Sequence, residues 1–585
     1  MPVQPLNIFS YYNVQRFIQS GSMDCANWYT LNVPDTKSGK MMYPAMGRKH
    51  VNFQNSNRLI FDAEPRAIFK SINYMYVVVG TRIFQIDRFY KTVQLSLNVS
   101  AEGDIWASYL PVETTVYVML TDGKDIFVIT EPSSGPTTIA KCTDLLKPSN
   151  PTFICTFGNR FVVSTKDTPI WTLSQINLGD DPSDPATWFS IPDGDTFFSL
   201  FASASGIVRQ LGTLHNQLYI FTDFTADIWS NIPTVIQVGT ETRVFPFKLS
   251  SAYNWDFGIA DPHTLSIDFG MMVWLGKNRS GLVTFMVSRG AQPQPISTQA
   301  INVLLESQVN SNGLSPFLSD NAVGFLYQWE NTVFYRVSAG KFLDFGQLDL
   351  EDSKNALEFN FNTQKWHRLI EINGERNRIQ KHVFFNNKHF VTVEDQTAVY
   401  EMRGDVYTNE LQLEDNPQAF KQYPMRYELT TSQIYQPDYS EFKTTYVEID
   451  FVFGEDTFVR MDTPFSTTTY ITDEQGNFLV TEESTPGTET FLIEEGTNFP
   501  TEADSHYNEL YKPHIELYWS DDGGITFHSA DVREFSNLGV YRWRMRWYEL
   551  GVSRNRVYKL VCVSGAPIVI LSAVHNLTRV SGGAN

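Results

Sequence analysis

A strand–turn–strand pattern recurs through the first two thirds of the sequence, and this recurrence constrains the fold more than any other feature. Between residues 66 and 402, hairpin-like segments follow one another at roughly 40–60 residues, which is the length of a four-stranded unit. The first strand of each segment is apolar and often continuous, as expected of a strand buried on both faces. The sequence therefore predicts a β-propeller of about six blades over residues 61–412, with a large β-sandwich as the competing fold. The segments begin at Tyr74 (YMYVVVGTRIFQID), Thr115 (TVYVMLTDGKDIFVIT), Asn159 (NRFVVSTKDTPIWTLS), Asn216 (NQLYIFTDFTADIWS), Met271 (MMVWLGKNRSGLVTFMVS) and Lys388 (KHFVTVEDQTAVYEM).

The composition also favours an all-β protein. Aromatic residues make up 14% of the 585 residues and charged residues only 19%. Tyr, Phe, Trp, Thr and Val are abundant, and these residues fit pleated, half-buried surfaces. The chain is long enough for several domains with large cores. The helical signal is weak throughout, and residues 297–307 (STQAINVLLES) are the best short candidate.

Two regions flank the predicted propeller. Residues 1–60 mix Pro, Gly and polar residues with aromatic residues, and we interpret them as an extended N-terminal arm that packs on something else. Residues 413–585 contain a second set of alternating segments, such as TTYVEIDFVFG, and are predicted to form a β-sandwich. Within it, residues 454–507 form an acidic insertion with two predicted hairpins. This insertion is either a solvated protrusion or a docking arm for a partner.

The formal net charge of −20 limits the possible partners. An acidic chain does not attract nucleic-acid phosphates in general, so we expect no specific binding of DNA. The four cysteines form no C-x-x-C motif, and few cysteines in a long chain suit a reducing cytosol. His382 and His389 are interpreted as incidental, and we predict no metal and no cofactor. We expect no signal peptide and no membrane-spanning segment.

The stretch YWSDDGGITFHSA at residues 518–530 matches the Asp-box pattern found in sialidases and other β-propeller proteins. The chemistry of this pattern is that of a turn, because an Asp accepts backbone hydrogen bonds and glycines permit positive φ. A glycan-cleaving enzyme needs separate groups, namely an arginine cluster, a tyrosine nucleophile and an acid/base carboxylate. The sequence has one copy of the pattern, in the predicted sandwich. We therefore predict no catalytic residue and a structural turn formed by Ser520, Asp522, Gly523, Gly524, Thr526 and Phe527.

The stretch YRWRMRW carries a row of three arginines. In a strand, Arg542, Arg544 and Arg546 share one face, and the aromatic residues and Met545 share the other. The aromatic face is predicted to be core. The arginine face is a candidate protomer interface, where it would meet an acidic neighbour. The alternative is a solvent-exposed row with scattered carboxylates around it.

Several stretches, taken in order, resemble the tail hub proteins of short-tailed bacteriophages, which are also called packaged-DNA stabilisation proteins. They are CANWYTLN with GKMMYPAMGR, GIVRQLGTLHNQLYIFTDFTADIWSN, GIADPHTLSIDFGMMVWLGKNRSGLVTFMVSRGAQPQPISTQAI, and the final strands around LGVSRNRVYKL. LGVSRNRVYKL is the most specific of these stretches. PAMG replaces the family's usual Thr-Pro-Gly, and the insertion at residues 454–507 is extra, but the resemblance covers most of the chain.

This resemblance implies a structural protein of the virion tail, synthesised in the cytoplasm of the host bacterium. Such hubs form a ring, typically a hexamer, that joins the head-to-tail adaptor and portal to a tail needle, tailspikes or fibres. The ring closes the DNA channel after packaging and takes part in genome ejection. DNA would pass an acidic channel without specific binding, and the N-terminal arm would reach an adjacent ring.

Two other functions stay open on the sequence. One is a glycan-binding or glycan-hydrolysing propeller, which the high aromatic content and the Asp-box pattern favour. The other is a host-side propeller that acts as an interaction platform. The enzyme predicts clustered Arg, Tyr and Glu on one propeller face, whereas the hub predicts large apolar and ionic contacts between protomers.

Overall fold

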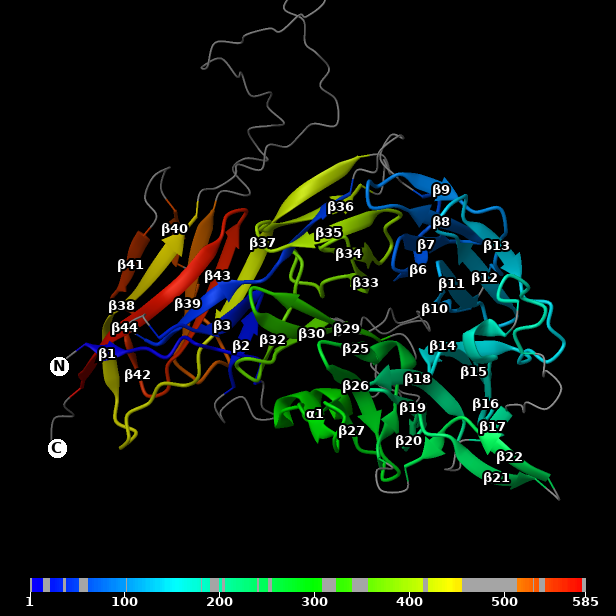
Figure 1. Cartoon of the computed structure of the whole chain (residues 1–585). Helices are drawn as coiled ribbons and strands as arrows, with labels where there is room; N and C mark the ends of the chain where they lie inside the picture. The colour runs from blue at the N-terminus through cyan, green and yellow to red at the C-terminus, as the bar shows by residue number, and fades with distance from the viewer. Residues whose placement is uncertain are drawn as a thin grey trace, which may run out of the picture.

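The computed structural model is an all-β molecule in which a ring of sheets lies beside a two-layered sandwich (Figure 1). It confirms the predicted fold class of a propeller followed by a sandwich. One short α-helix, α1 (Gln299–Ser307), lies within the stretch that the sequence favoured. Among the described residues, no helix is both long enough and apolar enough to cross a bilayer. The structure describes residues 3–13, 22–34, 38–51, 61–101, 103–179, 181–189, 199–201, 206–238, 241–250, 255–307, 322–338, 356–413, 419–454, 513–529, 531–535 and 542–580.

The first five units of the ring are separate antiparallel sheets. The first comprises β6 (Pro65–Lys70), β7 (Met75–Val79), β8 (Arg82–Ile86) and β9 (Thr92–Gln94), and the second β10 (Trp106–Val112), β11 (Thr115–Thr121), β12 (Ile126–Glu131) and β13 (Thr138–Lys141). The third comprises β14 (Pro151–Phe157), β15 (Arg160–Thr165), β16 (Ile170–Leu173) and β17 (Ser199–Phe201), and the fourth β18 (Val208–Leu214), β19 (Gln217–Thr222), β20 (Ala226–Ser230) and β23 (Lys248–Leu249). The fifth comprises β24 (Gly258–Ile259), β25 (Ser266–Asp268), β26 (Met271–Lys277), β27 (Val283–Ser288) and β28 (Gln294–Pro295).

The last two units belong to one 14-stranded sheet that continues into the sandwich. The sixth unit comprises β29 (Val323–Trp329), β30 (Thr332–Ser338), β31 (Ala356–Asn360) and β32 (Lys365–Arg368). The seventh comprises β33 (Ile379–Phe385), β34 (Lys388–Val393), β35 (Val399–Arg403), β5 (Gly47–His50) and β36 (Thr408–Gln412). Outside the blades lie the hairpin β21 (Thr234–Val238) and β22 (Glu241–Phe245) and the short 3₁₀ helices η2 (Ile176–Leu178) and η3 (Pro262–Thr264).

Hydrophobic clusters between neighbouring sheets close the ring. Each of seven clusters combines side chains from two adjacent units. The last cluster joins Met75 and Val77 of the first unit to Val383 and Phe390 of the seventh. Full burial of a Val, Phe or Met side chain stabilises the fold by roughly 1.5–3 kcal/mol. The apolar contacts between the first and seventh units therefore stabilise the closed ring.

The number of blades differs from the expected six, because the described residues form seven. The unit that was not counted is β29–β32, whose first hairpin, at residues 323–338, has the same strand–turn–strand pattern as the others. Glu330 and Asn331 close this hairpin with both φ angles positive, as a two-residue type I′ turn requires. His215–Asn216 and Asn386–Asn387 close two other inner hairpins in the same way.

The N-terminal segment is built into the fold, so the prediction of an extended arm over residues 1–60 is wrong for its described part. β2 (Asp24–Ala26) lies between β32 and β37 (Phe420–Thr430), and β5 completes the seventh blade beside β35. β1 (Gln4–Pro5), β3 (Trp28–Asn32) and β4 (Lys40–Pro44) lie in the sandwich. These strands join blades six and seven to the sandwich, so they are not available to reach an adjacent ring.

The two domains share strand β37, which makes them one continuous structure. Its first half pairs with β36 of the propeller and its second half pairs with β43 (Val557–Ser564) of the sandwich. β39 (His514–Ser520) and β40 (Asp531–Glu534) extend this layer, and the second layer has the order β3-β4-β44-β38-β41. The acidic insertion at residues 454–507 lies outside the described residues, apart from Gly454. The remaining strands are β38 (Phe442–Phe453), β41 (Arg542–Tyr548), β42 (Val552–Ser553) and β44 (Ile568–Arg579).

Candidate functional sites

The Asp-box turn follows β39 and is organised by the carboxylate of Asp522. This carboxylate accepts hydrogen bonds from the backbone N–H groups of Ile525 (2.9 Å) and Thr526 (3.0 Å) and from the hydroxyls of Ser520 and Thr526 (both 2.6 Å). Ser520 Oγ in turn accepts from the backbone N–H of Gly524 at 2.8 Å. The hydrogen bond from Ser520, followed by those from Thr526, holds the pKa of Asp522 well below its ordinary value. The turn therefore uses the full accepting capacity of the carboxylate.

The same turn is fastened to the sandwich by its neighbours. Gly523 and Gly524 have φ values of 83° and 99°, which only glycine adopts without strain. The carbonyl of Gly523 accepts a hydrogen bond from Gln433 Nε2 at 3.1 Å, and Asp521 pairs with the buried Arg556 at 2.7 Å. These contacts are those of a hydrogen-bonded turn, and the purely structural role expected from the sequence stays a prediction. Phe527, in contrast, is 38% exposed and contributes little to the core.

The arginine row lies on one face of β41, at the edge of the sandwich, and finds partners within its own sheet. Arg542 Nε donates to Asp450 at 2.9 Å, and Arg546 Nε donates to Glu448 at 2.6 Å. Arg544 Nε lies 3.3 Å from the same Glu448. Both carboxylates belong to the adjacent strand β38, where opposite charges on neighbouring strands stabilise the sheet.

The arginine row therefore has carboxylate partners within its own sheet, with or without an acidic neighbour from another chain. The guanidinium groups are still 41–56% exposed, so a protomer contact through Arg542, Arg544 and Arg546 stays a prediction. Among the described residues, no hydrogen bond or ion pair connects the arginine row to the Asp-box turn. The two motifs are thus separate parts of the sandwich and do not form one site.

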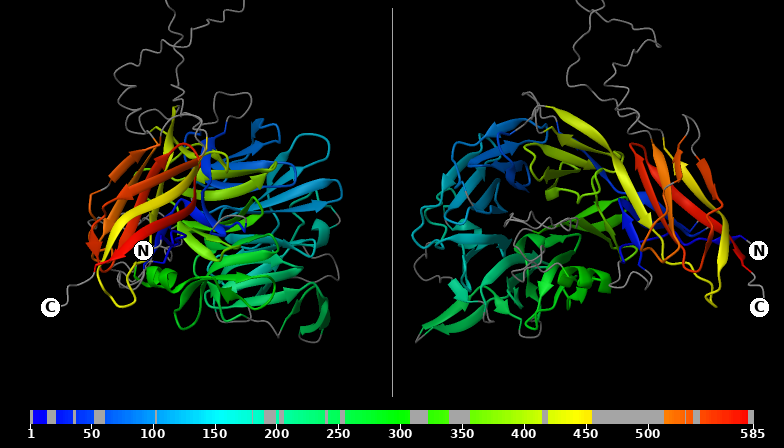
Figure 2. Two further views of the ribbon diagram at one scale, coloured as in Figure 1. Left: turned by 90° about the vertical axis from the view of Figure 1, so that its left-hand side faces the viewer. Right: turned by 180° about the vertical axis from the view of Figure 1, so that it is seen from behind.

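The hairpin β21–β22 is an apolar surface that the sequence analysis did not single out. It projects from the rim of the propeller on the side away from the sandwich (Figures 1 and 2). Val235 and Val244 are directly opposite each other in the register and are 65% and 59% exposed. Phe245, the next residue after Val244, is buried against Trp171 and belongs to the core between the third and fourth blades. Phe245 thus anchors one face of the hairpin in the core, and Val235 and Val244 are exposed on the opposite face.

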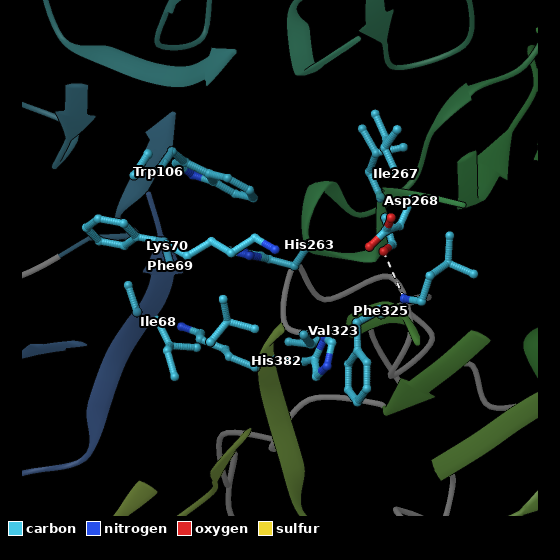
Figure 3. Close-up of a pocket in the computed structure, with 18 of the residues that line it drawn as sticks. Ile68, Phe69, Lys70, Trp106, His263, Ile267, Asp268, Val323, Phe325 and His382 are labelled. Atoms are coloured by element: carbon cyan, nitrogen blue, oxygen red, sulfur yellow. Dashed lines mark hydrogen bonds between the residues drawn. The ribbon is translucent and has the colours of Figure 1, made fainter. Parts of the chain in front are cut away.

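A cavity of about 340 Å³ lies between the innermost strands of five blades (Figure 3). These strands are β6, β10, β25, β29 and β33. Ionisable or aromatic side chains reach it from each of the five blades, among them Lys70, Trp106, His263, Phe325 and His382. The described lining contains no arginine, tyrosine or glutamate, so this cavity does not bring together the set of groups that the glycan-hydrolysing alternative predicted. Among the described residues there is also no cluster of three or more His, Cys, Asp or Glu that could hold a metal ion.

Comparisons with known proteins were made for the whole chain. Neither a family model nor a curated protein matches it. Among solved structures, the Pan2 WD40 domain of Neurospora crassa is 9% identical and covers 62% of this chain and 94% of its own, with a TM-score of 0.32. Hsv2p of Kluyveromyces lactis is 10% identical and covers 59% and 96%, with a TM-score of 0.26. An auxiliary nutrient binding protein of Bacteroides thetaiotaomicron is 9% identical and covers 61% and 76%, with a TM-score of 0.29.

Proposed function

We propose that this chain is a structural virion protein, the hub of a short bacteriophage tail. In this role several copies form a ring that joins the portal and adaptor to the distal tail, closes the DNA channel after packaging and takes part in genome ejection. The assignment to a phage tail rests on the resemblance of the sequence to the tail hub family. The portal, the adaptor and the distal tail are named as partners because they are the partners of that family. The exposed valine pair on the hairpin β21–β22 is the observation of the structure that carries the proposal of an assembly.

The valine pair supports an assembly because solvent-facing positions of a sheet are normally polar. A two-stranded hairpin is marginally stable in water, and an apolar outer face makes it less soluble without stabilising it. Covering Val235, Val244 and the 54% exposed Ile232 by another copy removes this surface from water. We therefore assign the hairpin to a protomer contact.

The shape of the chain supports a head-to-tail contact between copies. The hairpin and the sandwich lie at opposite ends of the molecule (Figures 1 and 2). The sandwich carries its own exposed aromatic residues, Tyr435 and Tyr439, whose rings stack at 5.6 Å. A contact between two different surfaces closes into a ring when the rotation between copies permits it. Strand β37 runs through both domains, so one continuous sheet connects the propeller to the sandwich that carries the second surface.

The experiment compares the assembly of the full-length chain with that of the double variant Val235→Asp/Val244→Asp by analytical ultracentrifugation. Val93→Asp is the matched control, because Val93 is 48% exposed on the outer strand of the first blade. We expect the wild type and the control to sediment as a ring and the double variant as a folded monomer of 66.8 kDa. A double variant that assembles like the wild type would show that the hairpin is not the contact.

A further inference from the structure

We propose that the central cavity of the propeller binds an acidic sugar unit, a pyranose ring that carries a carboxylate. This inference does not depend on the hub role, because the cavity is separate from the hairpin β21–β22. Its volume of about 340 Å³ lies in the range of small-molecule sites. Figure 3 shows Lys70, Trp106, His263 and His382 around the same hollow.

Lys70 is the cation that the cavity offers to an anion. Its ammonium group donates one hydrogen bond to the carbonyl of Phe384 at 2.8 Å, which leaves two of its three N–H donors. No described carboxylate lies within ion-pair distance of Lys70, although the chain carries a net charge of −20. An unpaired, exposed ammonium at the wall of a cavity is suited to hold the carboxylate of a ligand.

The second lysine of the cavity, Lys381, is already engaged by the protein. Its ammonium donates to the carbonyl of Arg66, and the carboxylates of Asp104 and Glu64 lie near it. Burial outweighs these two charges and lowers the pKa of Lys381. Lys381 is thus a structural cation, and the recognition of an anion falls to Lys70.

A chain of two histidines presents a hydrogen-bond acceptor to the cavity. His389 Nε2 lies 3.2 Å from the carbonyl of Gln328, which can only accept, so this nitrogen carries the proton. His389 Nδ1 is then an acceptor, and it lies 2.9 Å from His382 Nε2, which must donate. The two bonds leave Nδ1 of His382 with a free lone pair.

Burial, followed by the charges of His389, Lys70 and Arg336, lowers the pKa of His382 and keeps its ring neutral. Asp268 acts on His389 in the opposite direction, but burial is the larger effect and the pKa of His389 is also lowered. His382 therefore remains an acceptor at neutral pH, and it suits a ligand that donates O–H groups. The sequence offered no role for His382 and His389, and the structure brings their rings within hydrogen-bond distance.

The remaining walls combine aromatic and aliphatic side chains with the carboxylates of Asp104 and Asp268. The ring of His382 stacks on Phe325 at 4.6 Å, and the ring of His263 stacks on Trp106 at 4.7 Å. A hydrogen bond of 3.1 Å from His263 to Asp104 fixes the second pair. Although burial alone would raise the pKa of Asp104, this hydrogen bond and the charge of His263 lower it, so its carboxylate is an additional acceptor. Ile68, Ile267 and Val323 complete the lining.

A sugar acid matches this set of groups. Its carboxylate pairs with Lys70, its hydroxyls donate to His382 Nδ1 and Asp104, and its C–H face packs on the aliphatic wall. A neutral sugar lacks the group for Lys70, and an inorganic anion lacks the hydroxyls and the apolar face. We propose binding alone and no cleavage step, since the described part of the lining brings no tyrosine nucleophile together with an arginine cluster.

The test is isothermal titration calorimetry of the full-length chain with glucuronate, glucose and inorganic phosphate at 100 mM salt or less. We expect glucuronate to bind at least about tenfold more tightly than either glucose or phosphate. Lys70→Gln should weaken glucuronate binding by about tenfold or more, since it removes the charge and keeps the length of the side chain. Lys91→Gln is the matched control, because Lys91 is exposed on the first blade and does not line the cavity, and it should bind as the wild type does.

A second variant tests the histidine chain. His382→Phe keeps the stacking on Phe325 and removes the acceptor, and we expect it to weaken glucuronate by about fivefold or more. If His382→Phe does not fold, Lys70→Gln carries the test alone, because the exposed Lys70 is not needed for packing. Three results would overturn the inference: no binding of glucuronate at millimolar concentration, equal binding of phosphate, or unchanged binding by Lys70→Gln.

Discussion

Replacing Asp522 by alanine tests whether the Asp-box motif is a structural turn. The change removes the acceptor for four donor groups, the backbone N–H groups of Ile525 and Thr526 and the hydroxyls of Ser520 and Thr526. A protein hydrogen bond contributes about 0.5–1.5 kcal/mol net, and at this largely exposed turn water replaces part of each one. We therefore expect Asp522→Ala to destabilise the turn by about 1–2 kcal/mol.

Hydrogen exchange measured by mass spectrometry on peptides that cover residues 519–529 is the assay, because it reports local opening. A destabilisation of 1–2 kcal/mol corresponds to about 5–30-fold faster exchange of the Ile525 and Thr526 amides. Asp522→Asn keeps one acceptor oxygen and should show a smaller acceleration. Asp256→Ala is the matched control, since Asp256 is exposed and makes none of the hydrogen bonds found among the described residues.

The pH dependence of the same effect has a definite sign. Because the pKa of Asp522 is lowered in the folded turn, its stabilisation is fully present above the ordinary Asp pKa of about 3.9 and is lost as the pH falls below it. The difference between wild type and Asp522→Ala should therefore be constant from pH 7 to pH 5 and shrink towards pH 3. Equal exchange of wild type and Asp522→Ala at pH 7 would refute the structural reading of this motif.

Three further predictions concern the rest of the molecule. Arg48→Met should lower the free energy of unfolding, measured by urea denaturation, by about 3–5 kcal/mol, because it leaves the buried carboxylate of Glu371 without the guanidinium 2.8 Å away. Adding Glu371→Gln to this variant should restore part of the loss, because it removes the unpaired charge. Arg544→Glu should lower the mass of the assembly in sedimentation and leave the monomer folded, because it reverses the charge of a side chain that is 55% exposed on the candidate contact; an unchanged mass would dismiss the row as a protomer contact. Burial lowers the pKa of His575 to about 4, so between pH 6.5 and pH 4 the unfolded state binds more protons than the folded state, and the free energy of unfolding falls on acidification. His575→Gln should reduce this fall by about 2–3 kcal/mol, as measured by urea denaturation at pH 7 and pH 4.

The propeller could be predicted from the sequence because its signal is local. Each inner hairpin combines an apolar strand with a short turn whose residues tolerate positive φ, such as His215 and Asn216. The N-terminal strands carry no such signal, because their partners are distant in the chain. Ala26, for example, pairs with Glu428, and Arg48 pairs with Met402. A short strand whose partner strands lie hundreds of residues away has no local pattern, so the sequence does not distinguish it from a loop.

The candidate sites could be predicted only where one stretch contains the whole motif. The turn of Asp522 lies within eight residues, so its hydrogen bonds followed from the pattern. The carboxylate that contacts both Arg544 and Arg546 is that of Glu448 on β38, and only the register Glu448↔Arg546 brings these residues together. His382 and His389 are diagonal neighbours on one face of the hairpin β33–β34, because its two-residue turn sets the pairs Phe384↔His389 and His382↔Val391. The segment expected from the sequence began at Lys388 and left the strand of His382 out.

The mass of the unmodified full-length protein in solution tests the central claim most directly. Native mass spectrometry at micromolar concentration is the measurement. The hub proposal predicts a closed ring, with a mass near six times 66.8 kDa for a hexamer, and its reversion to monomer in Val235→Asp/Val244→Asp. A wild-type chain that stays at 66.8 kDa up to about 100 µM, with its hairpin valines still exposed, would contradict the claim.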